Sequence, residues 1–348
     1  MVNKELTKLQ KDIFYKLKFI RKVQVEMIRR YHDEDKMKCP MHFCIGQEIM
    51  PAVISSYLKK NDSVFSHHRS HGYFLSKKGS LKKMIAEFYG KISGTNGGLA
   101  GSQELSDTDI NFYSGTILSG ALAMGNGSAF ASKYQSNNNI TVSVIGDGGM
   151  EEGIVYEALN LAYLYKLPVL FICEHNTYST HTHILERTNS FDLIEKVKPH
   201  GIKCHKFNTN DSLLLAKKMD SIIKEVRKGK PQFVQINTYR FGSHVGPESD
   251  DHYGYRSTKE LNMWKKKDPI LKMRKILSDK KNFLQFDKNS DIQILNEINE
   301  AYKFADTSKF PKTYKDKNLT NSYSKKIKFY NNNIPLGGEQ ESHKPKPY

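Results

Sequence analysis

The chain has 348 residues and a formal net charge of +17, and it contains no run of 18 apolar residues that could span a membrane. Its length allows one large α/β domain, or one with a small appendage. The basic charge suggests nucleic-acid binding, but the lysines are spread along helical stretches and no zinc-finger, RNA-recognition or basic-zipper pattern is present. We therefore expect neither a nucleic-acid nor a membrane protein, and a basic surface that steers an acidic partner domain fits better.

The amino-terminal residues lack an apolar secretory core and a small-residue cleavage site, so we expect no presequence. Residues 4–38 follow the pattern of a long amphipathic helix, and we assign residues 1–40 to an amino-terminal helical segment. The four cysteines are scattered without metal-ligand spacing, which fits a reducing cytoplasm.

Residues 41–310 show alternating helical and buried-strand patterns, which predict one α/β domain. Along it we expect helices at 46–60, 80–90, 119–134, 152–165, 211–228, 258–280 and 290–306, and buried strands at 140–145, 169–173 and 232–238. Loops are expected at 67–72, 94–101, 177–188 and 241–255. Residues 311–348 have little apolar content and are expected to form a partly flexible carboxyl-terminal extension.

A Gly-Asp-Gly sequence is followed by Asn176, 29 residues after Asp147, and the segment between them is predicted as a βαβ unit. A parallel crossover would bring both strand ends to the edge where open α/β sheets bind cofactors. Asp147 and Asn176 would then offer two oxygen ligands to Mg²⁺, which phosphate oxygens complete. Gly148 and Gly149 leave room for a phosphate beside the following helix. The alternative is an ordinary α/β sheet with an aspartate in a turn.

Further motifs occur in a fixed order, at residues 43–48 (FCIGQE), 69–72 (RSHG), 98–102 (GLAGS), 111–113 (NFY), 238–240 (TYR) and 268–270 (DPI). With these motifs, the chain resembles the α subunit of two-chain 2-oxo-acid dehydrogenase E1 components, over about residues 20 to 310. The resemblance implies the thiamine-diphosphate-binding fold, in which helices cover both faces of a parallel sheet. It also implies thiamine diphosphate and Mg²⁺ as cofactors.

The resemblance assigns roles to individual residues of this chain. Arg69 falls where the family binds the diphosphate, a task that suits a guanidinium fork, and His68 beside it could donate to phosphate. The alternative for Arg69 is a surface salt bridge. His71 corresponds to a histidine near the thiazolium ring with an orienting or proton-handling role. Thr116 and Leu118 fall where main-chain groups contact the aminopyrimidine ring, although Leu118 could also be ordinary core.

Asp147 and Asn176 correspond to the metal ligands, with the carbonyl of Tyr178 as a third, while Gly148 and Gly149 would contact the diphosphate. His244 matches the loop histidine that faces the reacting carbon, where an imidazole can stabilise the substrate carboxylate and move a proton. A surface histidine is the alternative. His181 and His183 are expected in a solvated loop without a role.

Thiamine-diphosphate chemistry requires a carboxylic acid on the pyrimidine N1′, which in this family belongs to a pyrimidine-binding domain on a separate β chain. All the motifs here belong to the diphosphate-binding domain. We therefore expect this chain to act only with a β subunit, in an α₂β₂ assembly. The expected reaction decarboxylates a small 2-oxo acid and transfers the fragment to the lipoyl group of an acyltransferase.

The sequence also departs from the family. Glu104 stands where relatives commonly have a histidine near substrate, and the loop before His244 has lost another. These changes argue against pyruvate as the substrate. They suggest that Glu104 accepts hydrogen bonds from a hydroxyl- or amino-bearing 2-oxo acid or acceptor. Two alternatives stay open: a carboligase or lyase that uses a non-lipoyl acceptor, and a non-catalytic relative.

Overall fold

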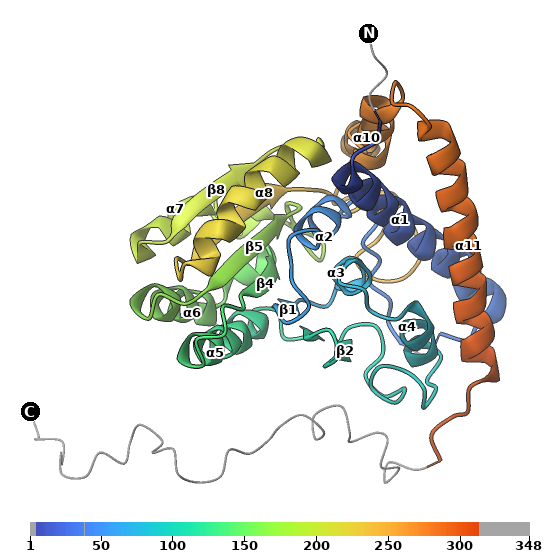
Figure 1. Ribbon diagram of the computed structural model, residues 1–348, viewed down its shortest axis with the longest axis horizontal. Helices are drawn as coiled ribbons and strands as arrows, with labels where there is room; N and C mark the ends of the chain where they lie inside the picture. The colour runs from blue at the N-terminus through green and yellow to red at the C-terminus, as the bar shows by residue number, and fades with distance from the viewer. Residues whose placement is uncertain (1–4, 38, 313–348) are drawn as a thin grey trace, which may run out of the picture.

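The computed structural model describes residues 5–37 and 39–312 (Figure 1). Its main sheet has the strand order β2-β3-β1-β4-β5-β9-β8. All neighbouring pairs are parallel except β2 with β3. The strands are β1 (Ser63–Ser66), β2 (Ser106–Asp107), β3 (Phe112–Ser114), β4 (Thr141–Gly146), β5 (Val169–His175), β8 (Lys203–Phe207) and β9 (Gln232–Asn237). A separate hairpin pairs β6 (Tyr178–Ser179) with β7 (Thr182–His183).

Helices cover both faces of this sheet, as predicted. Alternate residues of a strand point to opposite faces, and the two faces of β4 and β5 enter two different apolar cores. Val144 and Ile172 pack with α8 (Ser212–Arg227), whereas Ile145 and Phe171 pack with α5 (Gly120–Tyr134) and α6 (Gly153–Leu164). Burial on both faces explains why these strands are continuous apolar runs in the sequence.

The remaining helices form a second group beside the sheet, in which α1 and α11 run next to each other (Figure 1). The group comprises α1 (Lys8–Glu34), α2 (Ile49–Ile54), α3 (His71–Ser76), α4 (Leu81–Phe88), α10 (Pro269–Leu277) and α11 (Phe283–Thr307). A short α7 (Ile194–Val197) lies at the sheet, and α9 (Thr258–Lys265) packs against Tyr178 and Tyr239. Helix α1 begins at a capping box between Thr7 and Gln10. Among the described residues, no helix is long and apolar enough to cross a membrane.

Several predicted boundaries are wrong for identifiable reasons. The helix predicted at 258–280 is two helices, because Pro269 lacks an N–H and Asp268 before it takes an extended conformation that caps α10. The helix predicted at 46–60 spans only Ile49–Ile54. The loop predicted at 67–72 gives way to α3 at His71, and β1 before it was not predicted. The predicted extension 311–348 lies almost wholly outside the described residues.

The predicted βαβ unit is present as β4, α6 and β5. Strands β4 and β5 pair in parallel with Gly146 opposite Glu174, so both strands end at the same edge of the sheet. Asp147 follows β4 directly and Asn176 follows β5 directly. The two predicted metal ligands therefore lie at this shared edge.

Candidate active site

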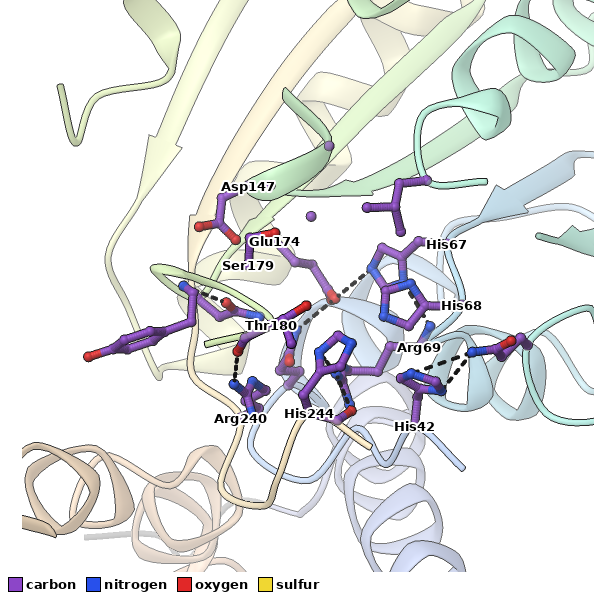
Figure 2. Close-up of a pocket in the computed structure, with 18 of the residues that line it drawn as sticks. His42, His67, His68, Arg69, Asp147, Glu174, Ser179, Thr180, Arg240 and His244 are labelled. Carbon is purple, nitrogen blue, oxygen red and sulfur yellow. Dashed lines mark hydrogen bonds and ion pairs between the residues drawn. The ribbon is translucent and has the colours of Figure 1, made fainter. Parts of the chain in front are cut away.

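A cavity of about 300 Å³ lies at the carboxyl ends of the parallel strands (Figure 2). Ten of the twelve residues predicted from the sequence line it: His68, Arg69, Thr116, Leu118, Asp147, Gly148, Gly149, Asn176, Tyr178 and His244. His71 and Glu104 do not. The cavity thus brings together five segments that are distant in the sequence: 68–69, 116–118, 147–149, 176–178 and His244.

Asp147, Asn176 and Tyr178 stand at one end of the cavity. The Asn176 side-chain oxygen accepts a hydrogen bond from the Tyr178 backbone N–H at 3.0 Å, which fixes the amide in place. Asp147 is buried and its Oδ2 accepts a hydrogen bond from Arg187 at 2.9 Å. The Nδ1 atom of His175 lies 3.7 Å from the same oxygen and has no hydrogen-bond partner among the described residues. This set of hard oxygen donors fits Mg²⁺.

The glycines beside Asp147 line the cavity with backbone alone, and we call this turn the glycine cradle. A Cβ on Gly148 would lie 2.5 Å from the Ser179 hydroxyl oxygen, and one on Gly149 would lie 2.7 Å from Ile145. Both glycines belong to a 3₁₀ turn, Gly148–Glu151, that leads into α6. Neither position has room for a side chain, and both glycines line the cavity, so their backbone can approach a diphosphate closely.

Arg69 holds two segments together at the opposite side of the cavity. Its guanidinium donates to the backbone carbonyl of Phe43 at 2.7 Å and to that of His244 at 3.0 Å. Arg69 is only 4% exposed, which excludes the alternative that it forms a surface salt bridge. Burial, with Arg240 as a second cause, lowers its pKa to about 10, so the guanidinium remains charged at neutral pH.

Three imidazoles surround this guanidinium. The ring centroids of His42, His68 and His244 lie 4.6 to 5.6 Å apart. Burial, followed by the charge of Arg69, lowers the pKa of His42 to about 2 and that of His244 to about 3, and it lowers the pKa of His68 as well. The imidazoles are therefore neutral in this state, and a bound anion would favour their protonation.

His71 lies behind the cavity wall at the start of α3. It is fully buried, and its ring bonds to Ser102 Oγ at 2.8 Å and to Gln24 Oε1 at 3.2 Å. Burial lowers its pKa to about 3. From this position His71 can orient the Arg69 segment, but its ring does not line the cavity.

Glu104 is exposed and accepts a hydrogen bond from the Thr116 hydroxyl at 2.5 Å. Thr116 and Leu118 line the cavity, and Ile117 between them is 75% exposed. The neighbouring Gln103 does line the cavity and contacts the ring of His42 at 3.2 Å. Glu104 thus lies at the rim, next to a lining residue.

Several residues that line the cavity were not predicted from the sequence, among them Glu174 and His42. Glu174 is buried and contacts Gln47 at 3.0 Å, the Tyr73 hydroxyl at 2.9 Å and His67 at 3.3 Å. His42 directly precedes the 43–48 motif, and Glu174 lies two residues before Asn176. Proximity to a recognised motif was the one signal that could have found them.

The loop at 241–255, which carries His244, is held by a buried ion-pair network. Asp250 pairs with Arg240 at 3.0 Å and also accepts hydrogen bonds from Arg256 and Tyr255. Burial alone would raise the pKa of Asp250, but the bonds from Tyr255 and Arg240 lower it below its ordinary value. Arg240 in turn donates to the Thr180 carbonyl at 2.6 Å. The network therefore ties this loop to the β6–β7 hairpin.

Comparison with solved structures defines the class of fold. Transketolase from Campylobacter jejuni superposes with a TM-score of 0.54 at 18% identity, over 87% of this chain and 49% of that chain. A mutant transketolase from Pichia stipitis gives a TM-score of 0.52 at 15% identity, over 86% of this chain and 49% of that chain. The chain spans about half the length of these structures, and the likeness establishes a transketolase-like fold.

Sequence comparison then defines the family. Residues 15–314 match the family described as "Dehydrogenase E1 component", so the chain belongs to that family. The pyruvate dehydrogenase E1 component subunit alpha of Rickettsia felis is 34% identical over 78% of this chain and 83% of its own length. The testis-specific mitochondrial form from Rattus norvegicus is 32% identical over 87% and 73%. These relatives favour the predicted dehydrogenase over the carboligase and non-catalytic alternatives.

Proposed function

We propose that this chain is the α subunit of a thiamine-diphosphate-dependent enzyme that decarboxylates a 2-oxo acid and passes the acyl fragment to a lipoyl group. The observation that carries the proposal is the convergence of Asp147, Asn176, Tyr178 and Arg69 on one cavity beside a glycine cradle. Membership of the E1 family and the names of its relatives agree with it.

In this proposal, Asp147, Asn176 and the Tyr178 carbonyl would hold Mg²⁺, and the diphosphate would bind to Gly148, Gly149, His68 and Arg69. Thiamine diphosphate supplies the electron sink for loss of CO₂. The protein contributes position and charge. Thr116 and Leu118 contact the pyrimidine side through their backbone, and His71 keeps the Arg69 segment in place through Ser102 and Gln24.

His244 is proposed as the proton-handling group. Its imidazole is neutral in this state, with a pKa held at about 3 by burial and then by Arg69. A substrate carboxylate nearby would oppose that positive charge and raise the pKa, since an opposite charge favours the protonated ring. Binding of the 2-oxo acid would therefore prepare the ring to donate a proton.

The active site requires a second chain in this proposal. We propose a β subunit that carries the pyrimidine-binding domain and the catalytic glutamate, in an α₂β₂ assembly in the cytoplasm. All four cysteines are free thiols, in agreement with that compartment. Glu104 at the rim is proposed to select the substrate or acceptor by accepting its hydrogen bonds. Unchanged substrate preference in both Glu104→Gln and Glu104→His would remove that role.

The test is decarboxylation by the purified α and β chains, measured with an artificial electron acceptor and a panel of 2-oxo acids. Activity should require thiamine diphosphate, Mg²⁺ and both chains. The variant Asp147→Asn should lose Mg²⁺-dependent cofactor binding in calorimetry, whereas Asp251→Asn, outside the cavity, should retain it. Cofactor binding that is equally tight in Asp147→Asn would contradict the assignment of the metal ligand.

A further inference from the structure

A second cavity, of about 260 Å³, lies beside α1 and the carboxyl ends of α2 and α3. Five lysines and a serine line most of it: Lys16, Lys59, Lys60, Lys77, Lys78 and Ser76. The chain brings them together because Lys59 and Lys60 follow α2, Ser76 ends α3, and Lys16 lies on α1, which packs against both helices (Figure 1). We call this cavity the lysine pocket.

The lysine pocket lies away from the candidate active site. Strand β1 begins at Ser63, just after Lys59 and Lys60, so the pocket is at the amino end of β1. The first cavity is at the carboxyl ends of the same parallel strands. Helix α3 separates the two, because Arg69 precedes its first residue and Ser76 is its last.

Positive charge in the lysine pocket exceeds the acids that could balance it. Lys16 pairs with Asp12 at 2.6 Å, whereas Lys59, Lys60, Lys77 and Lys78 form no ion pair within the described part of the chain. An isolated charge is normally left exposed to water, and lysine is among the residues that are least often buried. Lys59, Lys60 and Lys78 are exposed to water and make the cavity positive, whereas Lys77 is the one of these four whose charge is buried.

Lys77 gives the strongest indication. Its side chain is buried, since the residue is 8% exposed, and its amine donates to the Lys60 carbonyl at 3.3 Å. Burial lowers its pKa to about 8, and the acid that opposes this shift, Asp62, is already paired with Arg227. A buried ammonium group is thus held in the pocket without a counter-charge of its own, which an anion would supply.

Ser76 is a second, independent indication. It is 3% exposed, and its hydroxyl has no hydrogen-bond partner among the described residues. A buried hydroxyl without a partner costs about 1–3 kcal/mol. A phosphate oxygen in the pocket would accept this hydrogen bond, and lysine ammonium groups bind phosphate as point charges.

We infer that the lysine pocket is a binding site for a small phosphorylated molecule, separate from the diphosphate site. The volume of about 260 Å³ admits a compact ligand. Among the described residues, no aromatic side chain lines the pocket, which therefore offers no stacking surface for a single-stranded nucleic acid. This inference does not depend on the proposed catalytic function.

Calorimetric titration of the full-length chain with inorganic phosphate and pyrophosphate tests the inference. The variants are Lys77→Met and Ser76→Ala in the pocket, with Lys217→Met as a control for an exposed lysine elsewhere. Arg69→Gln serves to separate the two anion sites. We expect pyrophosphate binding in Arg69→Gln and Lys217→Met, and a loss of about tenfold or more in affinity at this site in Lys77→Met.

Thermal unfolding of each variant distinguishes a loss of binding from a loss of folding. Because Lys77→Met removes a buried charge without a counter-charge, its thermal midpoint without ligand should be equal to or higher than that of the wild type. Lys60→Ala, at an exposed position, should weaken binding without affecting folding. Undetectable binding of both anions at about 10 mM, a concentration well above the dissociation constant of a weak specific site, would overturn the inference. So would equal binding in Arg69→Gln alone and in Arg69→Gln combined with Lys77→Met or Lys60→Ala, or binding of an oligonucleotide alone.

Discussion

Asp250 holds the loop that carries His244, and replacing it with asparagine would remove the one carboxylate in the network. The side chains of Asp250 and Arg256 are fully buried, and that of Arg240 is 2% exposed. Asparagine keeps nearly the same volume, so the substitution tests charge rather than packing. Two guanidinium groups would remain buried without their acid.

Removal of one partner from a buried ion pair costs about 3–5 kcal/mol, far more than the loss of an exposed pair. We expect Asp250→Asn to fall in this range, because water cannot replace the lost carboxylate at a fully buried position. Asp251→Asn is the matched control. Asp251 is the next residue in the chain, is more exposed, and accepts a hydrogen bond from Ser249, so its replacement should leave the unfolding free energy nearly unchanged.

The assay is urea unfolding followed by circular dichroism, combined with limited proteolysis. The unfolding free energy should fall in Asp250→Asn, and cleavage within residues 241–255 should become faster. If the loop opens locally, cleavage will rise more than global unfolding changes. An unfolding free energy within about 1 kcal/mol of wild type, well short of the cost of a broken buried pair, together with unchanged cleavage would refute the reasoning.

Three further predictions concern the metal end, the buried histidine and helix packing. Arg187→Gln should tighten Mg²⁺-dependent cofactor binding by about tenfold in calorimetry, because it removes a cation bound to Asp147; weaker binding would mean that Arg187 itself holds the anion. The folded-state pKa of His71, about 3, lies below the ordinary 6.5, so its contribution to stability is present above pH 6.5 and is lost as pH falls towards 3. His71→Gln should therefore flatten the acid limb of the unfolding free energy by about 1.4 kcal/mol per pH unit between about pH 6 and 4, and an unchanged slope would count against this. Gly125→Ala should cost about 1–3 kcal/mol in urea unfolding, since its Cβ would lie 2.0 Å from a buried hydroxyl oxygen on β4. Gly127→Ala, on the same helix with open space, should gain up to about 1 kcal/mol, and equal effects would contradict the packing argument.

The central βαβ unit was predictable because β4 and β5 are buried on both faces and therefore appear as continuous apolar runs. Strands that are shorter or more exposed were not predictable. Strand β8 (KCHKF) is partly exposed and carries Lys203 and Lys206, so it shows neither a continuous apolar run nor a regular alternation. Strand β1 has four residues, too few for a periodic pattern. Sequence patterns thus revealed the longer apolar strands and missed both the short inner strand β1 and the partly exposed edge strand β8.

The site was predictable where a motif names its residues, as with Asp147, Asn176 and Arg69. Residues that reach the cavity through folding alone were missed, such as His42, which meets His68 and His244 only because Arg69 joins their segments. A family motif also does not show whether a residue lines the cavity, lies behind its wall or lies at its rim. His71 and Glu104 were both assigned to the site, yet one lies behind its wall and the other at its rim.

The parallel register of β4 and β5 has a consequence for how such sites vary in length. The positions of Asp147 and Asn176 depend on which residues pair across the two strands, with Gly146 opposite Glu174. The 29-residue interval between them depends instead on α6 and the turns that flank it. Insertion of whole helical turns into α6 would lengthen the interval without moving either oxygen ligand. The distance along the chain is therefore free to drift during evolution, while the distance in space is not.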